Sequence, residues 1–242
     1  MCTVSFVKHK EGFSLTSNRD EQKSRPTDPP KIYGEYKQNL IYPKDQKAGG
    51  TWIATSDRNI TVCLLNGAFS KHKHNPPYAK SRGIVLKERF VYSTNQKFID
   101  SVNLVGVEPF TLLLIDHNDK IDFKVLVWDG KEKYIENVNP NQNRIWASST
   151  LYGETERKNR KIWFKKYIEK TDEPNPEDLL KFHTGSFTSD KENDIVMQRG
   201  HDLKTVSVSQ INVLPTSKIF IYKDLEDHKI YTLNSKVQCE KV

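Results

Sequence analysis

The second residue of the chain brings two reactive groups together. If the initiator Met1 is removed, Cys2 carries both a thiol and a free α-amine. A free thiol titrates at about pH 8.5 and an α-amine at about 7.7–8.0, so the amine is a competent general base for its own thiol. Residues 3–7 read as a strand, and a second run ends in Ser17-Asn18-Arg19-Asp20-Glu21. A thiol at the edge of a sheet beside a charged cluster predicts a catalytic site.

Length and composition fit a soluble globular protein. The chain has 242 residues, of which 36% are hydrophobic and 29% charged. No apolar run approaches the roughly 20 residues that a membrane-spanning helix needs. Lys8, His9, Lys10 and Glu11 interrupt any signal-peptide core, so we expect a cytoplasmic location and no integral membrane segment. The three cysteines are too few for a disulfide framework and lack metal-ligand spacing.

The net charge of +7 does not by itself predict nucleic-acid binding, because the lysines alternate with acids and form no basic stripe with aromatics. One basic loop, Ser70-Lys71-His72-Lys73-His74, is an exception, and Lys80 and Arg82 follow it. A minor functional hypothesis is therefore an anionic-ligand site formed by Lys71, Lys73, Lys80 and Arg82. Of the expected site residues, we expect Trp52, Lys71 and Arg82 to contact the ligand or substrate. No third metal ligand is placed near the two histidines, so no metal site is predicted.

The pattern of apolar residues predicts strands at both ends of the chain and helical blocks between strands. Residues 3–7 and 13–18 form a hairpin, and residues 22–48 read as a long loop. Residues 82–104 have helical periodicity. The other expected strands are 51–55, 60–65, 110–115, 123–128, 145–149, 204–212, 216–222 and 228–234, and the other expected helices are 154–169 and 175–182. Because no domain linker or repeat interrupts this order, we expect one α+β domain over residues 1–242, with two sheets stacked between helix layers.

Several short segments together resemble the NRDE family, also called the transport and Golgi organisation 2 (TANGO2) family. They are Met1-Cys2-Thr3, Asn18-Arg19-Asp20-Glu21, Ser24-Arg25-Pro26, Gly49-Gly50-Thr51-Trp52, Leu65-Asn66 and Ser81-Arg82-Gly83. The first 85 residues carry nearly all of this resemblance.

That family is similar in turn to N-terminal-nucleophile hydrolases with a catalytic cysteine, such as bile salt hydrolases and penicillin acyltransferases. The resemblance implies a four-layer αββα sandwich. It also implies that Cys2 is the nucleophile, that Arg19 lies beside the thiolate and that Asn66 helps to form an oxyanion hole. The hydrolases carry an Asp where this chain has Gln22, so the nearby acid that could orient the α-ammonium is Asp20.

Two functional hypotheses follow from these residues. In the first, the chain is a hydrolase or acyltransferase that acts on a linear amide or thioester through a Cys2 acyl-enzyme. In the second, it carries a small anionic or acyl-bearing ligand without turnover, and the family's associations then suggest haem, lipid or acyl-CoA. The residues themselves predict no cofactor, and haem binding enters only through the resemblance. The departures at Gln22 and at Ser149, where the hydrolases have a second Asn, favour the second hypothesis.

Some candidate residues also have a structural interpretation. Arg19 could pair with a buried acid, and Asp20 could cap a turn. Trp52 is expected in the core or in a pocket wall, and Cys63 is expected to be an inert core residue. Since neighbouring strand residues point to opposite faces, Arg19 and Asp20 can share one site only where the strand ends or bulges.

Overall fold

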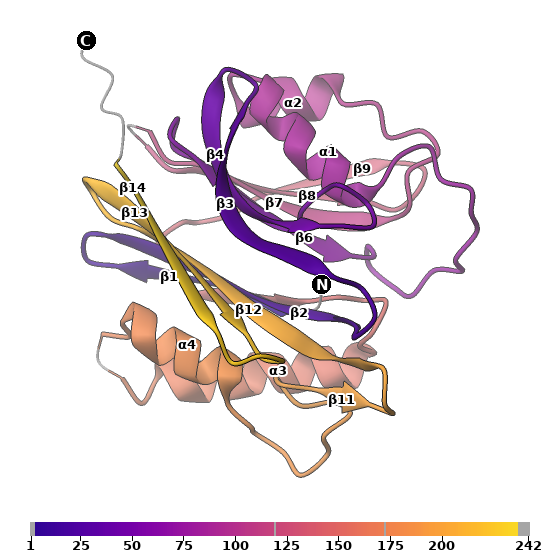
Figure 1. Ribbon diagram of the computed structural model, residues 1–242, viewed down its shortest axis with the longest axis vertical. Helices are drawn as coiled ribbons and strands as arrows, with labels where there is room; N and C mark the ends of the chain where they lie inside the picture. Colours follow the sequence, from indigo (N-terminus) through magenta and orange to yellow (C-terminus); the bar gives the residue numbers. More distant parts are fainter. Residues whose placement is uncertain (1–2, 119, 172, 237–242) are drawn as a thin grey trace.

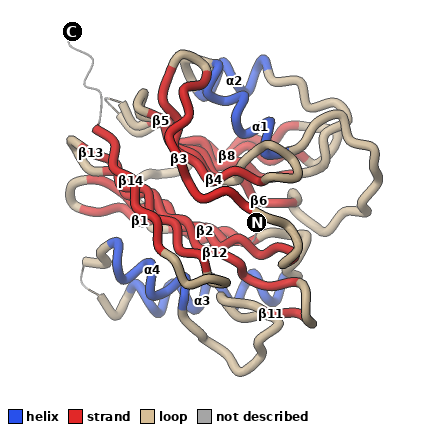
Figure 2. The backbone as a smooth tube through the Cα atoms, viewed as in Figure 1, coloured by secondary structure: helices blue, strands red, loops and turns tan. Residues whose placement is uncertain are grey.

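Two antiparallel sheets face each other across a core of apolar side chains, and each sheet carries helices on its outer face (Figure 1). The computed structural model describes residues 3–118, 120–171 and 173–236. Figure 2 shows the two helix layers at opposite ends of the view, with both sheets between them. This is the four-layer αββα sandwich that the resemblance implies. No described helix is long and apolar enough to cross a membrane.

The first sheet is built around the N-terminal hairpin and runs in the order β10-β1-β2-β12-β13-β14, with β11 beside β12. Successive side chains of its strands point to opposite faces of the sheet. One face packs against the second sheet, and the opposite face packs against helices. The strands are β1 (Thr3–His9), β2 (Gly12–Gln22), β10 (Arg144–Ala147), β11 (Gln198–Arg199), β12 (Leu203–Val213), β13 (Ser217–Asp224) and β14 (Ile230–Lys236).

The second sheet is a meander in which each strand pairs with the next along the chain, from β3 to β9. Short connections of this kind are typical of antiparallel sheets. The strands are β3 (Thr27–Glu35), β4 (Gln38–Asp45), β5 (Ile53–Ser56), β6 (Ile60–Asn66), β7 (Phe110–Asp116), β8 (Asp122–Trp128) and β9 (Lys133–Asn137).

The helices cover the outer faces in pairs. The helices α1 (Arg82–Glu88) and α2 (Asn95–Ser101), joined through the 3₁₀ turn η1 (Arg89–Val91), lie on the second sheet, whereas α3 (Glu154–Ile168) and α4 (Pro176–Thr184) lie on the first. Side-chain caps start three of them, because Ser81, Thr94 and Asn175 each accept a hydrogen bond from a backbone N–H of the first turn.

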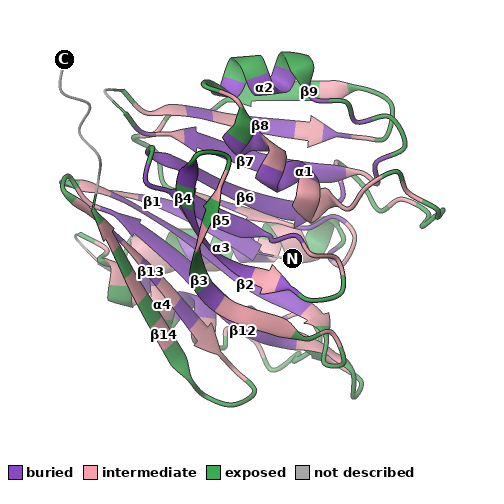
Figure 3. Ribbon diagram, turned by 45° about the horizontal axis from the view of Figure 1, so that its top comes forward, coloured by how far each residue is buried: buried purple, intermediate pink, exposed green. Residues whose placement is uncertain are grey.

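Three of the four apolar clusters among the described residues correspond to the three interfaces between layers. Val4, Phe6 and Leu15 of the first sheet meet Ile53 and Leu113 of the second in the central cluster. The other two clusters lie between each sheet and its own helices. Figure 3 shows the strands largely buried and the outer helix faces exposed. Strands β2 and β6 are therefore buried on both faces, which makes them rigid supports for any side chain that they carry.

One expectation about secondary structure was wrong. Residues 22–48 are not a loop, since they contain β3 and β4; Pro29 and Pro30 fall at a register shift of β3, an edge strand, where a missing N–H is tolerated. The helical block expected at residues 82–104 is confirmed, as two helices joined through a 3₁₀ turn. Tyr92 is extended, and Thr94 caps a new helix.

Candidate functional site

The charged motif on β2 divides its side chains between the two faces of the first sheet. Asn18 and Asp20 lie on the helix side, where they bond residues of α4 and of the segment before α3. Arg19 lies on the other side, toward the second sheet, where it contacts Trp52 and Asp45. The opposite strand β12 has a register shift between Thr205 and Ser207, yet it does not bring Arg19 and Asp20 to one face.

Arg19 is held in a buried position by charge and by aromatic contact. Its residue surface is only 2% exposed. Its Nη2 atom donates to Asp45 Oδ2 at 2.9 Å, and its guanidinium carbon lies 4.7 Å from the centre of the Trp52 ring. A buried guanidinium needs a counter-charge, and the stacked ring adds a cation–π attraction. The structure therefore confirms the interpretation in which Arg19 pairs with a buried acid, and it places Trp52 in both the core and the cavity wall.

Asp45, at the end of β4, joins two arginines. Its Oδ2 atom also accepts from Arg25 Nε at 2.7 Å, and its Oδ1 atom accepts the Ala48 N–H at 2.9 Å. Burial alone would raise the pKa of Asp45, but the Ala48 N–H and the guanidinium groups of Arg25 and Arg19 outweigh it, so the pKa lies below its usual value. Asp45 is thus a carboxylate at neutral pH.

These residues line a cavity of about 500 Å³, called here the Arg19 cavity. Asn66 reaches it from the last position of β6, and the Asn66 carbonyl is fixed by a 2.6 Å hydrogen bond from Ser148 Oγ. The residues that line the cavity are Arg19, Glu21, Arg25, Asp45, Ala48, Gly50, Thr51, Trp52, Leu64, Asn66, His74, Tyr78, Lys80, Ser81, Arg82, Gly83 and Glu108.

Glu108 organises the far wall of the Arg19 cavity. Arg82 Nη2 lies 3.0 Å from its Oε2 atom, while ring nitrogens of His72 and His74 lie 3.1 and 3.2 Å from Oε1. Burial would raise the pKa of Glu108, but Arg82 and the two histidine hydrogen bonds lower it overall. The cationic charge of Arg82 is therefore already matched within the wall.

The wall also depends on a close backbone approach between the start of α1 and the segment before β5. A Cβ atom on Gly83 would lie 2.7 Å from the Thr51 carbonyl oxygen, and one on Gly50 would lie 2.6 Å from the Gly83 carbonyl carbon. Both neighbours are backbone atoms that cannot swing away. Close packing here therefore requires glycine at both positions.

On the opposite face of the first sheet, Asp20 belongs to a separate buried network. Its carboxylate accepts hydrogen bonds from Tyr152 Oη at 2.7 Å and from Thr205 Oγ1 at 2.6 Å. The Tyr152 ring lies 3.5 Å from the guanidinium carbon of Arg160, which donates to Thr3 Oγ1 at 3.2 Å. Asp20 is thereby linked to the first described residue of β1.

A second network on this face fixes α4. The Nε2 atom of His183 lies 2.7 Å from Ser5 Oγ, and its Nδ1 atom bonds Asn18 Oδ1. Asn18 donates in turn to the carbonyls of His183 and Ile195. Burial lowers the pKa of His183 to about 3, so its ring is neutral. Because all three side chains are 0% exposed, this serine–histidine–asparagine set is a structural clamp with no route for a substrate.

The structure brings together four of the expected site residues: Arg19, Trp52, Asn66 and Arg82 line one cavity. Asp20 faces the other side of the sheet, and Lys71 is exposed and does not line the Arg19 cavity. Cys2 lies outside the described residues. Thr3, which follows it in sequence, is paired with Asn18, the neighbour of Arg19. Cys63 is fully buried, as expected of a core residue, and burial raises its pKa to about 12.

Sequence reasoning missed Asp45 and Glu108. Asp45 fell in the segment interpreted as a loop, so nothing placed it near Arg19. The one available signal was general: a buried arginine needs an acid, and that acid had to come from outside the motif. Among the described residues, no group of three or more His, Cys, Asp or Glu side chains is placed to hold a metal ion.

Comparison with known proteins places this geometry in context. The family model for TANGO2, transport and Golgi organisation 2, matches residues 1–236. No curated protein sequence matches the chain. A variant of the conjugated bile acid hydrolase from Clostridium perfringens superposes with a TM-score of 0.62 at 10% identity, and the match covers 97% of this chain and 96% of that one.

Two further solved structures have the same fold. Penicillin V acylase from Agrobacterium tumefaciens gives a TM-score of 0.57 at 10% identity over 96% of this chain and 86% of that one. The Caenorhabditis elegans orthologue of N-acylethanolamine-hydrolyzing acid amidase gives a TM-score of 0.58 at 11% identity. That match covers 87% of this chain and 92% of the other. At such identities these likenesses show a shared architecture.

Proposed function

The chain belongs to the transport and Golgi organisation 2 family, and on that premise we propose that it is an N-terminal-cysteine hydrolase or acyltransferase. Its substrate would be a small molecule with a linear amide or thioester, and its location would be cytoplasmic. The observation that carries this proposal is the position of Arg19: a buried guanidinium lines a cavity one residue along β2 from the partner of Thr3. Cys2 is bonded to Thr3, and consecutive Cα atoms are about 3.8 Å apart.

The proposed reaction needs an activated thiol and a place for negative charge. The α-amine of Cys2 would accept the thiol proton, and Arg19 would favour the thiolate electrostatically. Attack on the acyl carbon would release the amine or thiol and leave an acyl group on Cys2, which water or a second nucleophile would then accept. Asn66, at the end of a rigid strand, would donate to the developing oxyanion.

A trapping experiment tests this proposal. Protein from cells is incubated with the N-acetylcysteamine thioester of decanoic acid and analysed by intact mass and N-terminal sequencing. The proposal predicts a mature N-terminus at Cys2 and a decanoyl adduct that Cys2→Ser abolishes and the thiol-matched control Cys63→Ala retains. A retained Met1, or an adduct of equal yield in Cys2→Ser, would overturn it.

A second candidate is binding without turnover, on the same scaffold. It is favoured by the separation of Asp20 from Arg19 and by the ion pair through which Asp45 already matches the charge of Arg19. Native mass spectrometry of protein from a cell extract distinguishes the two: a co-purifying lipid or acyl-CoA without a covalent adduct supports a carrier.

Haem is the cofactor that the family resemblance suggests, and it requires an axial ligand such as His, Cys, Met or Tyr. The one described histidine that lines the Arg19 cavity, His74, is bonded to Glu108. The cavity's one described tyrosine, Tyr78, accepts the Asn75 N–H through its hydroxyl. Because these side chains are already engaged in the cavity wall, the described residues of the Arg19 cavity do not fit haem.

A further inference from the structure

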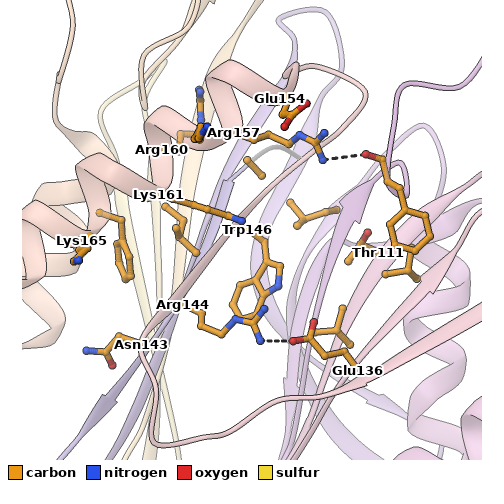
Figure 4. A pocket seen from close by; sticks show the side chains of 18 of the residues that line it. Thr111, Glu136, Asn143, Arg144, Trp146, Glu154, Arg157, Arg160, Lys161 and Lys165 are labelled. Carbon is orange, nitrogen blue, oxygen red and sulfur yellow. Dashed lines mark hydrogen bonds and ion pairs between the residues drawn. The ribbon is translucent and has the colours of Figure 1, made fainter.

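A second and larger cavity, of about 930 Å³, lies along the open edge of the first sheet (Figure 4). We call it the α3 cavity, because α3 forms one wall and the edge strand β10 and the inner side of β6–β9 form the others. Figure 4 shows Trp146 between α3 on one side and Thr111 and Glu136 on the other. Its volume is within the range of about 300–1,000 Å³ that is typical of small-molecule sites.

The floor of the α3 cavity is apolar and continues the core between the sheets. Leu65 and Val125 belong to that core, and Val127 and Trp146 pack against it. Leu65 and Val125 are buried, whereas Val127 and Trp146 are half-buried, because the first sheet ends at β10 and no further strand covers them. Covering apolar surface of this kind is favourable at roughly 25 cal/mol per Å². The floor therefore suits the apolar part of a ligand.

The wall formed by α3 is basic. Arg157, Lys158, Lys161 and Lys165 follow one another at intervals of one to four residues, and all line the cavity. Lys165 pairs with Glu169, but across the described chain Arg157, Lys158 and Lys161 have no carboxylate at ion-pair distance. Arg157 instead donates to the Phe69 carbonyl at 3.0 Å, and both residues line the cavity.

Charge is unbalanced around the whole cavity. Three acids line it, and the one on the strand side, Glu136, is already paired with Arg144, which stacks on Trp146. Six basic residues also line it: Arg144, Arg157, Lys158, Arg160, Lys161 and Lys165. A cationic wall over an apolar floor is complementary to a molecule that is apolar along its body and negatively charged at one end.

We propose that the α3 cavity binds an anionic amphiphile, with its apolar body against Trp146 and Val127 and its carboxylate, phosphate or sulfonate group at Lys158 and Lys161. An acidic peptide or a nucleic acid strand fits less well, because an apolar floor offers its polar backbone no partners. The proposal does not rest on acyl transfer at Cys2. It concerns a cavity whose lining residues differ from those of the Arg19 cavity.

Equilibrium dialysis with radiolabelled dodecanoate, below its critical micelle concentration, tests the site. Dodecanoate should bind with one-to-one stoichiometry and much more tightly than 1-dodecanol, which has the same chain without the charge. The double variant Lys158→Glu, Lys161→Glu should bind dodecanoate about tenfold more weakly or worse, because two attractive charges become repulsive. Raising the salt concentration should weaken binding to the wild-type chain.

The matched control is Lys166→Glu, Lys170→Glu, which reverses the same amount of charge at exposed positions that do not line the α3 cavity. It should keep binding within about threefold of the wild type, since exposed charges at a distance are screened. Val127→Trp, which fills the floor, should abolish binding. Circular dichroism and the unfolding temperature check that each variant is folded.

Three results would overturn the proposal: no saturable binding of dodecanoate, equal affinity for 1-dodecanol, or equal loss in the two double variants. A Cys2→Ser variant separates this proposal from the previous one. It should bind dodecanoate as the wild type does even if no acyl adduct ever forms, and loss of binding in it would contradict a noncovalent site at α3.

Discussion

One carboxylate oxygen, Asp45 Oδ2, accepts hydrogen bonds from Arg19 at 2.9 Å and from Arg25 at 2.7 Å. Arg19 comes from the first sheet and Asp45 from the second, so this contact ties the two sheets together at the cavity. It also sets where the guanidinium of Arg19 lies relative to Trp52 and Asn66. The geometry of the site therefore depends on an acid that is 26 residues away from Arg19 in the chain.

Replacing Asp45 with Asn should leave Arg19 buried without its counter-charge. We expect the free energy of unfolding to fall by about 3 kcal/mol at pH 7, as measured by urea denaturation. Asp28→Asn is the control, because the Asp28 carboxylate accepts an exposed hydrogen bond from Gln46. An unchanged stability in Asp45→Asn would contradict the role assigned to this pair.

The same pair predicts a pH dependence. The folded pKa of Asp45 is lower than its unfolded value of about 3.9, so its contribution is fully present above that value. The contribution is lost as the pH falls through the folded pKa. The stability difference between wild type and Asp45→Asn should therefore shrink as acid is added below about pH 4.

His183 should make the protein less stable in mild acid. Its folded pKa is about 3 and its unfolded value is about 6.5, so between these values the unfolded chain binds a proton that the folded chain does not. Stability should then fall with decreasing pH by up to about 1.4 kcal/mol per unit from this group. His183→Gln should flatten that slope in urea unfolding measured from pH 7 to 4, whereas the exposed His201→Gln should not.

Gly83→Ala should disturb the cavity wall through the backbone. The new Cβ atom would meet the Thr51 oxygen at 2.7 Å and the Thr51 nitrogen at 2.9 Å, so α1 would have to move. We expect a loss of about 1–3 kcal/mol, typical of overpacking. Gly34→Ala is a matched control, since nothing lies within 4 Å of its added Cβ, and it should be neutral by thermal denaturation. Equal effects of the two changes would argue against the close approach.

Arg19→Gln should slow the alkylation of Cys2 near neutral pH. Loss of a nearby cation raises a thiol pKa, so the rate with iodoacetamide at pH 7 should fall by roughly tenfold and recover at high pH. Arg25→Gln is the control, because it also removes a cation from Asp45 but leaves Arg19 in place. A rate in Arg19→Gln equal to that of the control at every pH would show that Arg19 does not act on the thiol.

Most of the secondary structure could be predicted from the sequence, because the apolar periodicity of a strand or a capped helix is local. It predicted β1 and β2, β6 to β8, both C-terminal helices and the last three strands. The family resemblance implied the αββα architecture. The sequence pattern failed at β3 and β4, where Pro29 and Pro30 are typical of a loop. An edge strand with a register shift tolerates them, and edge position is a property of the whole sheet.

The tertiary structure decided which residues form the site. Residues 18 to 21 look like one cluster in the sequence, but neighbouring side chains of a strand point to opposite faces. Asp20 therefore accepts a hydrogen bond from Tyr152, whereas Arg19 pairs with Asp45. The sequence pattern did not predict the basic wall of the α3 cavity either, because its lysines are typical of any exposed helix face. That helix face lines an apolar floor because the first sheet ends at β10. The identity of an edge strand depends on long-range strand pairing, which a local sequence pattern does not show.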